Sequence, residues 1–291
     1  MSAKVKLCIG TSGWSYPTGQ GTWKEYFYPA GVKNELEYYG QFFNTVEINS
    51  SFYRPPNPDY VSRWVQRVPE DFIFTVKLWQ KFTHPGMYQA ATGEAAAVSR
   101  DDIDLFQSSI EVLHRFGKLG ALLAQFPPGF RNDAYGQQLL KAVITNFGGY
   151  RLAVELRHRS WSDDKSTAEL LREFNVAWVQ IDEPKFPSSI AGDIPVTANM
   201  AYFRFHGRNR ENWWRGDGET RYRYLYSQEE IDELAGKVKA AAEQSDLTLA
   251  FFNNHWQGYA PRNAVDMKKA LRLPFREIHV PRRLLDEDMQ K

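Results

Sequence analysis

The sequence predicts a single-domain α/β protein with the TIM (β/α)8 barrel fold. Eight short apolar runs alternate with stretches of helical periodicity, which implies parallel strands joined by right-handed crossovers. The length of 291 residues suits one such barrel, for which about 250 residues is typical. Because no Pro- or Ser-rich linker divides the chain, we expect a barrel over residues 1–280 and a charged peripheral tail over 281–291. A doubly wound open sheet is the alternative.

The predicted strands and helices follow one another at the spacing of βα units. The strands are expected at residues 5–10, 45–49, 72–77, 119–125, 152–157, 177–182, 201–206 and 247–253. Helical patterns occupy seven of the connections, at residues 35–43, 59–68, 101–116, 135–147, 166–174, 228–244 and 262–271. The sixth strand is instead followed by an irregular segment that contains prolines.

The composition excludes several classes of protein. The chain has 36 Lys and Arg against 35 Asp and Glu, a net charge of +1, which disfavours a globally basic nucleic-acid binder. A single cysteine, Cys8, allows no intrachain disulfide and no multi-cysteine metal site. No run approaches the roughly 18 apolar residues of a membrane span. We therefore expect a cytoplasmic protein that does not bind membranes.

Three long connections, at residues 14–34, 78–100 and 207–227, follow the first, third and seventh predicted strands. In a barrel, loops that follow strands lie on the C-terminal face, where active sites of this fold are built. The first of them continues the turn Gly10-Thr11-Ser12-Gly13-Trp14. This turn has neither the spacing of a dinucleotide fingerprint nor that of a P-loop, so no cofactor is predicted.

Alternation along the strands predicts which side chains point into the barrel. Apolar residues of the second, fifth and seventh strands share one face, which should meet the helices, and polar residues share the other. In the sixth strand we expect Val179 and Ile181 to point outward and Asp182 inward. The inward polar set near the strand ends is then Glu47, Asn49, Lys77, Gln125, Glu155, Arg157, Asp182, Arg204 and His206.

Two interpretations of this polar set stay open. It could be a structural layer of ion pairs, or it could line a ligand pocket, as strand-end charges in this fold usually do. In the pocket interpretation, Glu47 and Glu155 are candidates for general acid or base, and His206 is a candidate proton-transfer group. The candidate ligand-binding residues are Trp14, Asn49, Tyr53, Lys77, Gln125, Arg157, His158, Asp182, Arg204, Asn253 and Asn254.

The ends of the seventh and eighth strands predict an oxyanion site. Arg204 and His206 share one face of the seventh strand, and Asn253 and Asn254 end the eighth. Neighbouring strands lie about 5 Å apart, so these side chains and the Gly207 amide could surround one sulfate or phosphate. Capping of the loops by the asparagines is the alternative.

Two other functions remain alternatives. The segment 207–227 interleaves five arginines with five Trp and Tyr residues, a combination that suits a nucleic-acid or partner-binding groove. His158 or His206 with a carboxylate could form a metal centre of the kind found in sugar isomerases and phosphodiesterases. We expect no tightly bound metal, however, because the carboxylates are interspersed with cations.

Several ordered motifs resemble the domain-of-unknown-function 72 (YecE-like) family. They are IGTSGW at 9–14, EINSSFY at 47–53, LLAQFPP at 122–128, VELRHRSW at 154–161, RFHGR at 204–208 and FFNN at 251–254, together with Lys77 and the pair Thr83-His84. The resemblance spans residues 5 to about 271. It implies a TIM barrel, but it implies no activity. A fold-level likeness to endonuclease IV and sugar-isomerase barrels is an analogy only.

The sequence therefore predicts a barrel with a polar pocket for a small polar or phosphate-bearing ligand, and hydrolase is the catalytic class considered first. A barrel that binds nucleic acid or a partner without catalysis is the alternative, and a metal-dependent isomerase or phosphodiesterase is a third hypothesis. The sequence indicates neither the substrate nor the oligomeric state.

Overall fold

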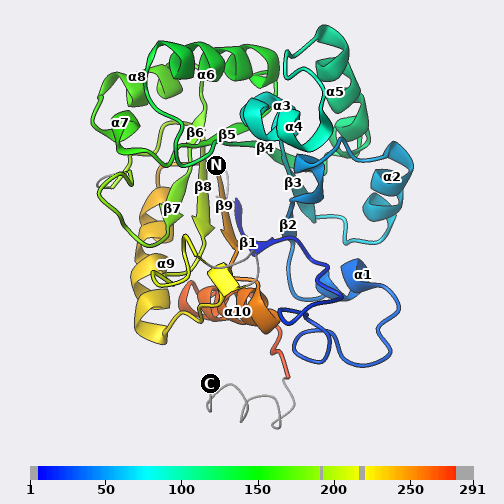
Figure 1. Ribbon diagram of the computed structural model, residues 1–291. Helices are drawn as coiled ribbons and strands as arrows, with labels where there is room; N and C mark the ends of the chain where they lie inside the picture. Colours follow the sequence, from blue (N-terminus) through cyan, green and yellow to red (C-terminus); the bar gives the residue numbers. More distant parts are fainter. Residues whose placement is uncertain (1–5, 191–192, 216–219, 280–291) are drawn as a thin grey trace, which may run out of the picture.

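The computed structural model describes residues 6–190, 193–215 and 220–279, which form one parallel sheet surrounded by helices (Figure 1). The strand order is β6-β5-β4-β3-β2-β1-β9-β8-β7, and every neighbouring pair runs parallel. β6 and β7 are separated only by Val179, whose N–H still donates to Val154 O of β5. This continuity brings the two edges of the sheet together in a nearly closed barrel. The predicted TIM-barrel fold is confirmed, and the open-sheet alternative is wrong.

All eight predicted strands are present, and their described ends differ from the predicted ones by at most two residues; the sixth is divided into two. The strands are β1 (Lys6–Ser12), β2 (Thr45–Ile48), β3 (Ile73–Lys77), β4 (Leu119–Gln125), β5 (Leu152–Glu155), β6 (Ala177–Trp178), β7 (Gln180–Asp182), β8 (Met200–Phe205) and β9 (Leu247–Phe252).

The seven predicted helices are also present. They are α1 (Glu35–Tyr39), α2 (Pro58–Gln66), α5 (Arg100–Arg115), α6 (Ala134–Phe147), α8 (Ser166–Glu173), α9 (Gln228–Ala242) and α10 (Tyr259–Ala270). The first ends four residues earlier than predicted, at Tyr39. The loops carry additional short elements: α3 (Gln80–Thr83), α4 (Pro85–Thr92), α7 (Arg159–Ser162), η1 (Ser50–Phe52), η2 (Thr220–Tyr222) and η3 (Trp256–Gly258). The predicted tail at 281–291 lies outside the described residues.

The barrel has two apolar layers. A large cluster fills the space between the sheet and the helices, and a smaller cluster fills the lower part of the barrel interior. The interior cluster includes Cys8, Leu123, Ala153, Tyr202 and Leu249, which alternate with outward residues along their strands. Because this apolar floor occupies the lower interior, polar side chains are confined to the carboxyl ends of the strands.

The sixth strand has the opposite orientation to the one predicted. Val179 belongs to the interior cluster and Ile181 packs against it, whereas Trp178 belongs to the outer cluster. Both faces of this strand carry apolar residues, so the rule that apolar side chains face the helices could not decide between them. As a consequence, Asp182 points away from the barrel interior, and the next residue, Glu183, points toward it.

None of the helices at residues 6–190, 193–215 and 220–279 combines the length and the apolar character that a membrane span requires.

Candidate functional site

Arg204 is the centre of a buried ion-pair network at the carboxyl ends of the strands. Its Nη2 and Nε donate to the two oxygens of Glu47 at 2.7 and 3.0 Å, and its Nη1 donates to Glu155 Oε2 at 2.6 Å. The three residues belong to β8, β2 and β5, so the network spans the barrel. Arg204 is 2% exposed and both carboxylates are completely buried. Here the cost of burying charge is offset by short, charge-assisted hydrogen bonds.

The network continues downward to the apolar floor through Tyr202. The Tyr202 hydroxyl donates to Glu47 Oε2 at 2.7 Å and is 3.0 Å from Thr75 Oγ1. Both oxygens of Glu47 are therefore engaged by buried donors. This arrangement holds the Glu47 carboxylate in one position and leaves it out of reach of solvent.

On the other side, the network continues to Arg157 and His206. Arg157 Nε donates to Glu155 Oε1 at 2.6 Å, and its Nη2 lies 3.2 Å from His206 Nε2. Because an arginine can only donate, Nε2 accepts this hydrogen bond and the neutral ring carries its proton on Nδ1. This Nδ1–H faces the side-chain amide of Asn253 at 2.9 Å, and it donates there when the amide is turned so that its oxygen meets the ring, because the amide nitrogen is itself a donor. The structure brings Glu47, Glu155, Arg157, Arg204 and His206 together, but their side chains are mostly buried and do not line the open pocket that was predicted.

The charges of this network control its protonation. Burial alone would raise the pKa of Glu155, but the adjacent Arg157 and Arg204 overcome that effect and hold it well below its usual range. Burial, reinforced by the positive charge of Arg157, lowers the pKa of His206 to about 3. At neutral pH the network therefore contains ionised Glu155 and neutral His206.

These contacts change the predicted role of Arg204. All three of its nitrogens donate to carboxylates and the residue is only 2% exposed, so an oxyanion could not reach it without displacing these contacts. The anion site predicted around Arg204 and Asn254 is therefore wrong in this form. Asn254 points elsewhere: its amide donates to Tyr224 O and Asn263 Oδ1. It is a buried loop cap, which was the alternative considered for it.

Lys77 is the cation that this network leaves without a carboxylate. It ends β3, and no hydrogen bond or ion pair joins its ammonium group to any residue that the structure describes. Its Nζ lies 4.1 Å from the ring centroid of Phe52. Burial and the nearby positive charge of Arg204 lower the pKa of Lys77 to about 7, despite the opposing effect of Glu155 and Glu47. Lys77 as a whole residue is half-buried.

Two further polar atoms at the strand ends lack hydrogen-bond partners. Asn49 Oδ1 and Ser12 Oγ are buried and unpaired. The register that pairs Ile48 with Val76 places Asn49 next to Lys77, and Ser12 lies opposite Glu47 on the other side of β2. Buried polar groups are usually satisfied, so these two atoms would accept or donate hydrogen bonds to a bound molecule or water.

A roof over His206 is formed by the loop after β8, defined here as residues 207–215 and 220–226. The rings of Trp213 and Tyr222 lie 6.3 and 6.2 Å from His206, and Tyr222 also contacts His255 at 5.1 Å. Gly207 begins the roof with φ +89°, and a Cβ there would come within 2.7 Å of Tyr224 Cβ. A side chain at this position would displace the roof.

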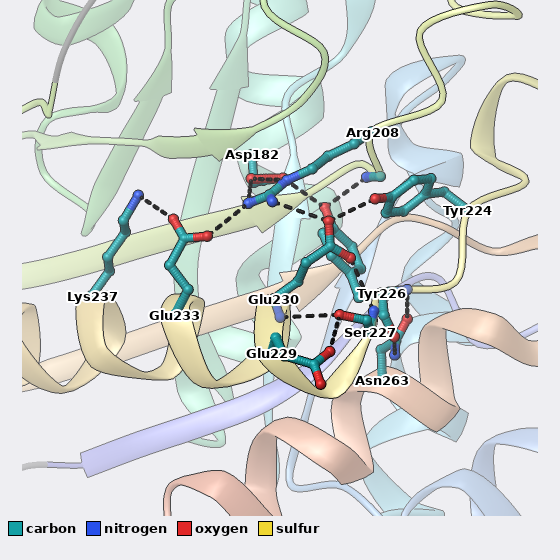
Figure 2. A network of polar contacts seen from close by, with 11 residues as sticks. Asp182, Arg208, Tyr224, Tyr226, Ser227, Glu229, Glu230, Glu233, Lys237 and Asn263 are labelled. Atoms are coloured by element: carbon teal, nitrogen blue, oxygen red, sulfur yellow. Dashed lines mark hydrogen bonds and ion pairs between the residues drawn. The ribbon is translucent and has the colours of Figure 1, made fainter.

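Asp182 helps to attach this roof to the barrel rather than lining the mouth. Figure 2 shows Arg208 held between Asp182 of β7 and the acidic residues of α9. Arg208 donates to both oxygens of Asp182 at 2.7–3.0 Å and to Glu230 at 3.0 Å. The Tyr226 hydroxyl donates to Asp182 as well, at 3.0 Å. The predicted inward position of Asp182 is wrong because the strand has the opposite orientation.

Three other predicted ligand residues also lie away from the network. Trp14 packs edge-on against Trp64 of α2, at the outside of the barrel. Tyr53 is 70% exposed beside Phe52. His158 caps α7, where its side chain accepts from the Ser160 N–H. Gln125 keeps the predicted place, level with Glu155 at the end of β4, and is partly exposed.

The sequence interpretation missed several residues of this region. Glu183 lies 3.5 Å from Arg157 Nη1, and burial raises the pKa of its carboxyl group. It could have been found by placing Val179 and Ile181 inside the barrel, since Glu183 continues the same alternation. Phe52 and Tyr222 belong to loops, where alternation gives no signal.

The described residues contain no group of three or more His, Cys, Asp or Glu side chains arranged to hold a metal ion. The carboxylates of the network face arginines instead. The segment with five arginines likewise uses several of them internally: Arg208 in the ion pairs above, Arg210 on Lys185 O and the Phe186 ring, and Arg223 over Trp256.

Comparisons with known proteins agree with this architecture. The chain is 28% identical to the UPF0759 protein YunF of Bacillus subtilis, over 96% of this chain and 99% of that protein. It is 33% identical to the UPF0759 protein YecE of Escherichia coli over 78 residues, 27% of this chain and 25% of YecE. A crystal structure of a DUF72 family protein from Thermotoga maritima has a TM-score of 0.79 and 36% identity, covering 92% of this chain and 99% of that one. A DUF72 family protein from Enterococcus faecalis has a TM-score of 0.78 and 27% identity, covering 94% of this chain and 98% of that one.

The family model described as "Protein of unknown function DUF72" matches residues 8–287, nearly the whole chain. This match agrees with the resemblance seen in the sequence motifs. The chain belongs to the DUF72 family.

Proposed function

We propose that the mouth of this barrel binds a small anionic ligand, such as a phosphate ester or a carboxylate, through Lys77 and Arg157. The observation that carries this proposal is the unpaired ammonium group of Lys77 at the end of β3. An amine held without a carboxylate beside two arginines is electrostatically unfavourable, and an anion would stabilise its charged form. Barrels of this kind build their binding sites at the strand ends where Lys77 lies.

Arg157 is better suited to this role than Arg204. Its Nη1 reaches Glu183 only at 3.5 Å, a looser contact than the 2.6 and 2.7 Å bonds that hold Arg204. The Arg157 side chain is also 10% exposed, against 2% for Arg204. An oxyanion could therefore take hydrogen bonds from Arg157 Nη1 without breaking the central network. Asn49 and Ser12 offer additional polar atoms for hydroxyl groups of the ligand.

In this proposal, Glu47, Glu155 and His206 position the two arginines and do not react with the ligand. Each of their polar side-chain atoms is already engaged within the network, so none is free to abstract a proton from a ligand in this arrangement. They hold Arg204 and Arg157 in place and set the positive potential at the mouth. Hydrolysis would require one of these contacts to open, and binding alone does not.

The nucleic-acid alternative receives less support. A nucleic-acid groove needs exposed arginines and aromatic rings, whereas Trp213 and Tyr226 are buried and Arg208 is paired with carboxylates. Trp214 is the exposed aromatic residue of the roof, at 57%. The roof side chains mainly attach the loop to the barrel.

Binding of inorganic phosphate and sulfate tests the proposal. We expect both anions to bind the wild-type protein. Lys77→Met should weaken their binding by about ten- to a hundredfold, which is the effect of losing one charge-assisted hydrogen bond. Lys237→Met removes the same charge from the exposed face of α9 and should leave binding unchanged. Titration calorimetry at low ionic strength gives the dissociation constants. Equal weakening in both variants would mean that only general charge attraction is measured, and no loss in Lys77→Met would overturn the proposal.

A further inference from the structure

A separate groove lies beside the barrel mouth, between the loop after β3 and the loop after β4. It has a volume of about 440 Å³, within the range of small-molecule sites. Its wall is mainly apolar, and its polar members are Thr83, His84, Arg131 and Asp133, the last two of opposite charge. The main apolar residues that line it are Pro85, Met87, Pro127, Phe130, Tyr135 and Leu139.

The floor of the groove is rigid. Phe130 is stacked between Phe126, at 4.1 Å, and Trp161, at 5.3 Å between ring centroids. The Trp161 indole N–H donates to Phe130 O at 2.9 Å, which keeps the loop after β4 in place. At the rim, by contrast, Met87 of α4 and Tyr135 of α6 are 52% and 60% exposed. The groove is thus a preformed apolar surface that remains open to solvent.

His84 connects the groove with the mouth. Its imidazole lines the groove and lies edge-on to Phe52, with 4.9 Å between ring centroids. Lys77 Nζ lies 4.1 Å from the centroid of the same Phe52 ring. The sum of these separations places Lys77 at most about 9 Å from the His84 ring. Nδ1 of His84 is engaged by Thr83 Oγ1 at 2.9 Å, which orients the ring. The groove and the cation are therefore neighbours, joined through the Phe52 ring, at a separation that a short alkyl chain can span.

We infer that this groove holds the apolar tail of the same ligand whose anionic head is bound at Lys77, so that the natural ligand is an amphipathic alkyl or aryl phosphate or carboxylate. This inference rests on the proposed function of the mouth. The occupant is a small molecule rather than a protein segment, because the groove has ligand-sized volume and its wall includes His84, which contacts the same Phe52 ring as the unpaired cation. Each methylene group buried in such a groove strengthens binding roughly fourfold.

A series of methyl, butyl and hexyl phosphate tests the inference. All three carry the same head group, and only the longer chains can pass Phe52 and reach the groove. We expect methyl phosphate to bind like inorganic phosphate and hexyl phosphate to bind at least tenfold more tightly, as measured by ligand-observed NMR titration. Affinity that does not rise with chain length would overturn the inference and leave the anion site at Lys77 standing.

Two matched substitutions locate the tail. Met87→Glu places a charge on the groove rim, and Leu105→Glu places the same charge on α5 at a residue of similar exposure, 54%. We expect hexyl phosphate to bind Met87→Glu no more tightly than methyl phosphate does. In Leu105→Glu, hexyl phosphate should keep its higher affinity. Equal effects of the two variants would show that the tail binds elsewhere.

Lys77→Met separates the two proposals. This substitution should weaken the binding of all three phosphates by the same factor, because it changes only the head-group site. If hexyl phosphate binds through the groove but methyl phosphate is unaffected by Lys77→Met, the proposed function fails and so does the joint occupancy inferred here. If no member of the series binds, both are overturned.

Discussion

Arg204 and Glu47 are joined across the barrel by two hydrogen bonds, from Nη2 to Oε1 at 2.7 Å and from Nε to Oε2 at 3.0 Å. This bidentate pair connects β8 with β2, strands that are separated in the sheet by β9 and β1. A third bond from Nη1 to Glu155 brings in β5. One guanidinium group thereby links three strands in the upper interior, where apolar packing gives way to polar contacts. Its first consequence is structural.

Removal of Arg204 should strongly destabilise the fold. Arg204→Met leaves Glu47 and Glu155 buried without their main partner, and loss of one member of a buried ion pair typically costs about 3–5 kcal/mol. We expect a fall of that size in the free energy of unfolding, measured by urea denaturation at pH 7. Arg159→Met, which removes an exposed helical ion pair with Asp163, should change it little.

A second substitution tests the cause of this loss. Glu47→Gln in the Arg204→Met background removes one of the two unpaired charges and should recover part of the stability. If the double variant is less stable than Arg204→Met, the loss comes from packing rather than from unpaired carboxylates.

His206 should make the fold less stable in mild acid. Its pKa is about 3 in the folded protein and near 6.5 when unfolded, so the unfolded chain binds the extra proton first. The stabilisation is complete above pH 6.5 and is lost as the pH falls toward 3, by about 1.4 kcal/mol per pH unit. His206→Gln keeps a polar side chain that does not titrate. Its unfolding free energy should therefore fall less than that of wild type between pH 7 and 5. Parallel pH profiles of the two proteins would contradict this assignment.

The sequence predicted the architecture and the inward groups of three strands because one face of those strands is clearly apolar and the other clearly polar. β2, β5 and β8 are of this kind, and Glu47, Glu155 and Arg204 lie where alternation placed them. The strand divided into β6 and β7 has apolar residues on both faces, so alternation had two solutions and the wrong one was chosen. Helical and strand periodicity gave the fold because each repeats over many residues.

The partners of each charged group could not be predicted in the same way. Alternation indicates that Arg204 points inward, but not that its three nitrogens all donate to two buried carboxylates and leave no room for an anion. That outcome depends on side-chain length and strand register across the barrel. The sequence likewise could not show that Lys77 lacks a carboxylate partner, because only the folded structure shows that the nearby carboxylates are paired with arginines.

Arg208 should control the mobility of the roof. It joins the start of the roof to Asp182 and Glu230, and Ser227 with Glu230 forms the capping box of α9 (Figure 2). Arg208→Met removes these ion pairs from a partly exposed position. We expect faster amide hydrogen exchange in the roof, residues 207–215 and 220–226, and unchanged exchange in β4 and β5. Faster exchange throughout the barrel would instead indicate a general loss of stability.

Anion binding should weaken as the pH rises above 7, because the ammonium group of Lys77 loses its proton there. Burial and the charge of Arg204 lower the pKa of Lys77 to about 7, whereas a bound anion favours the charged form and raises it. Sulfate is the suitable probe because it does not itself titrate in this range. Its affinity should be constant below pH 6.5 and fall by roughly tenfold per pH unit above 7, until the pKa of the complex is reached.

Calorimetry at pH 8 in two buffers of different ionisation enthalpy should then show uptake of close to one proton on binding. The pKa of Glu155 is held well below its usual range and the pKa values of Arg157 and Arg204 are raised, so these neighbours keep their charges and the proton is assigned to Lys77. Lys77→Met should bind sulfate weakly, with no dependence on pH and no proton uptake. Wild-type affinity that stays constant from pH 6 to 9 would show that the Lys77 ammonium group either keeps its charge throughout or does not contact the anion.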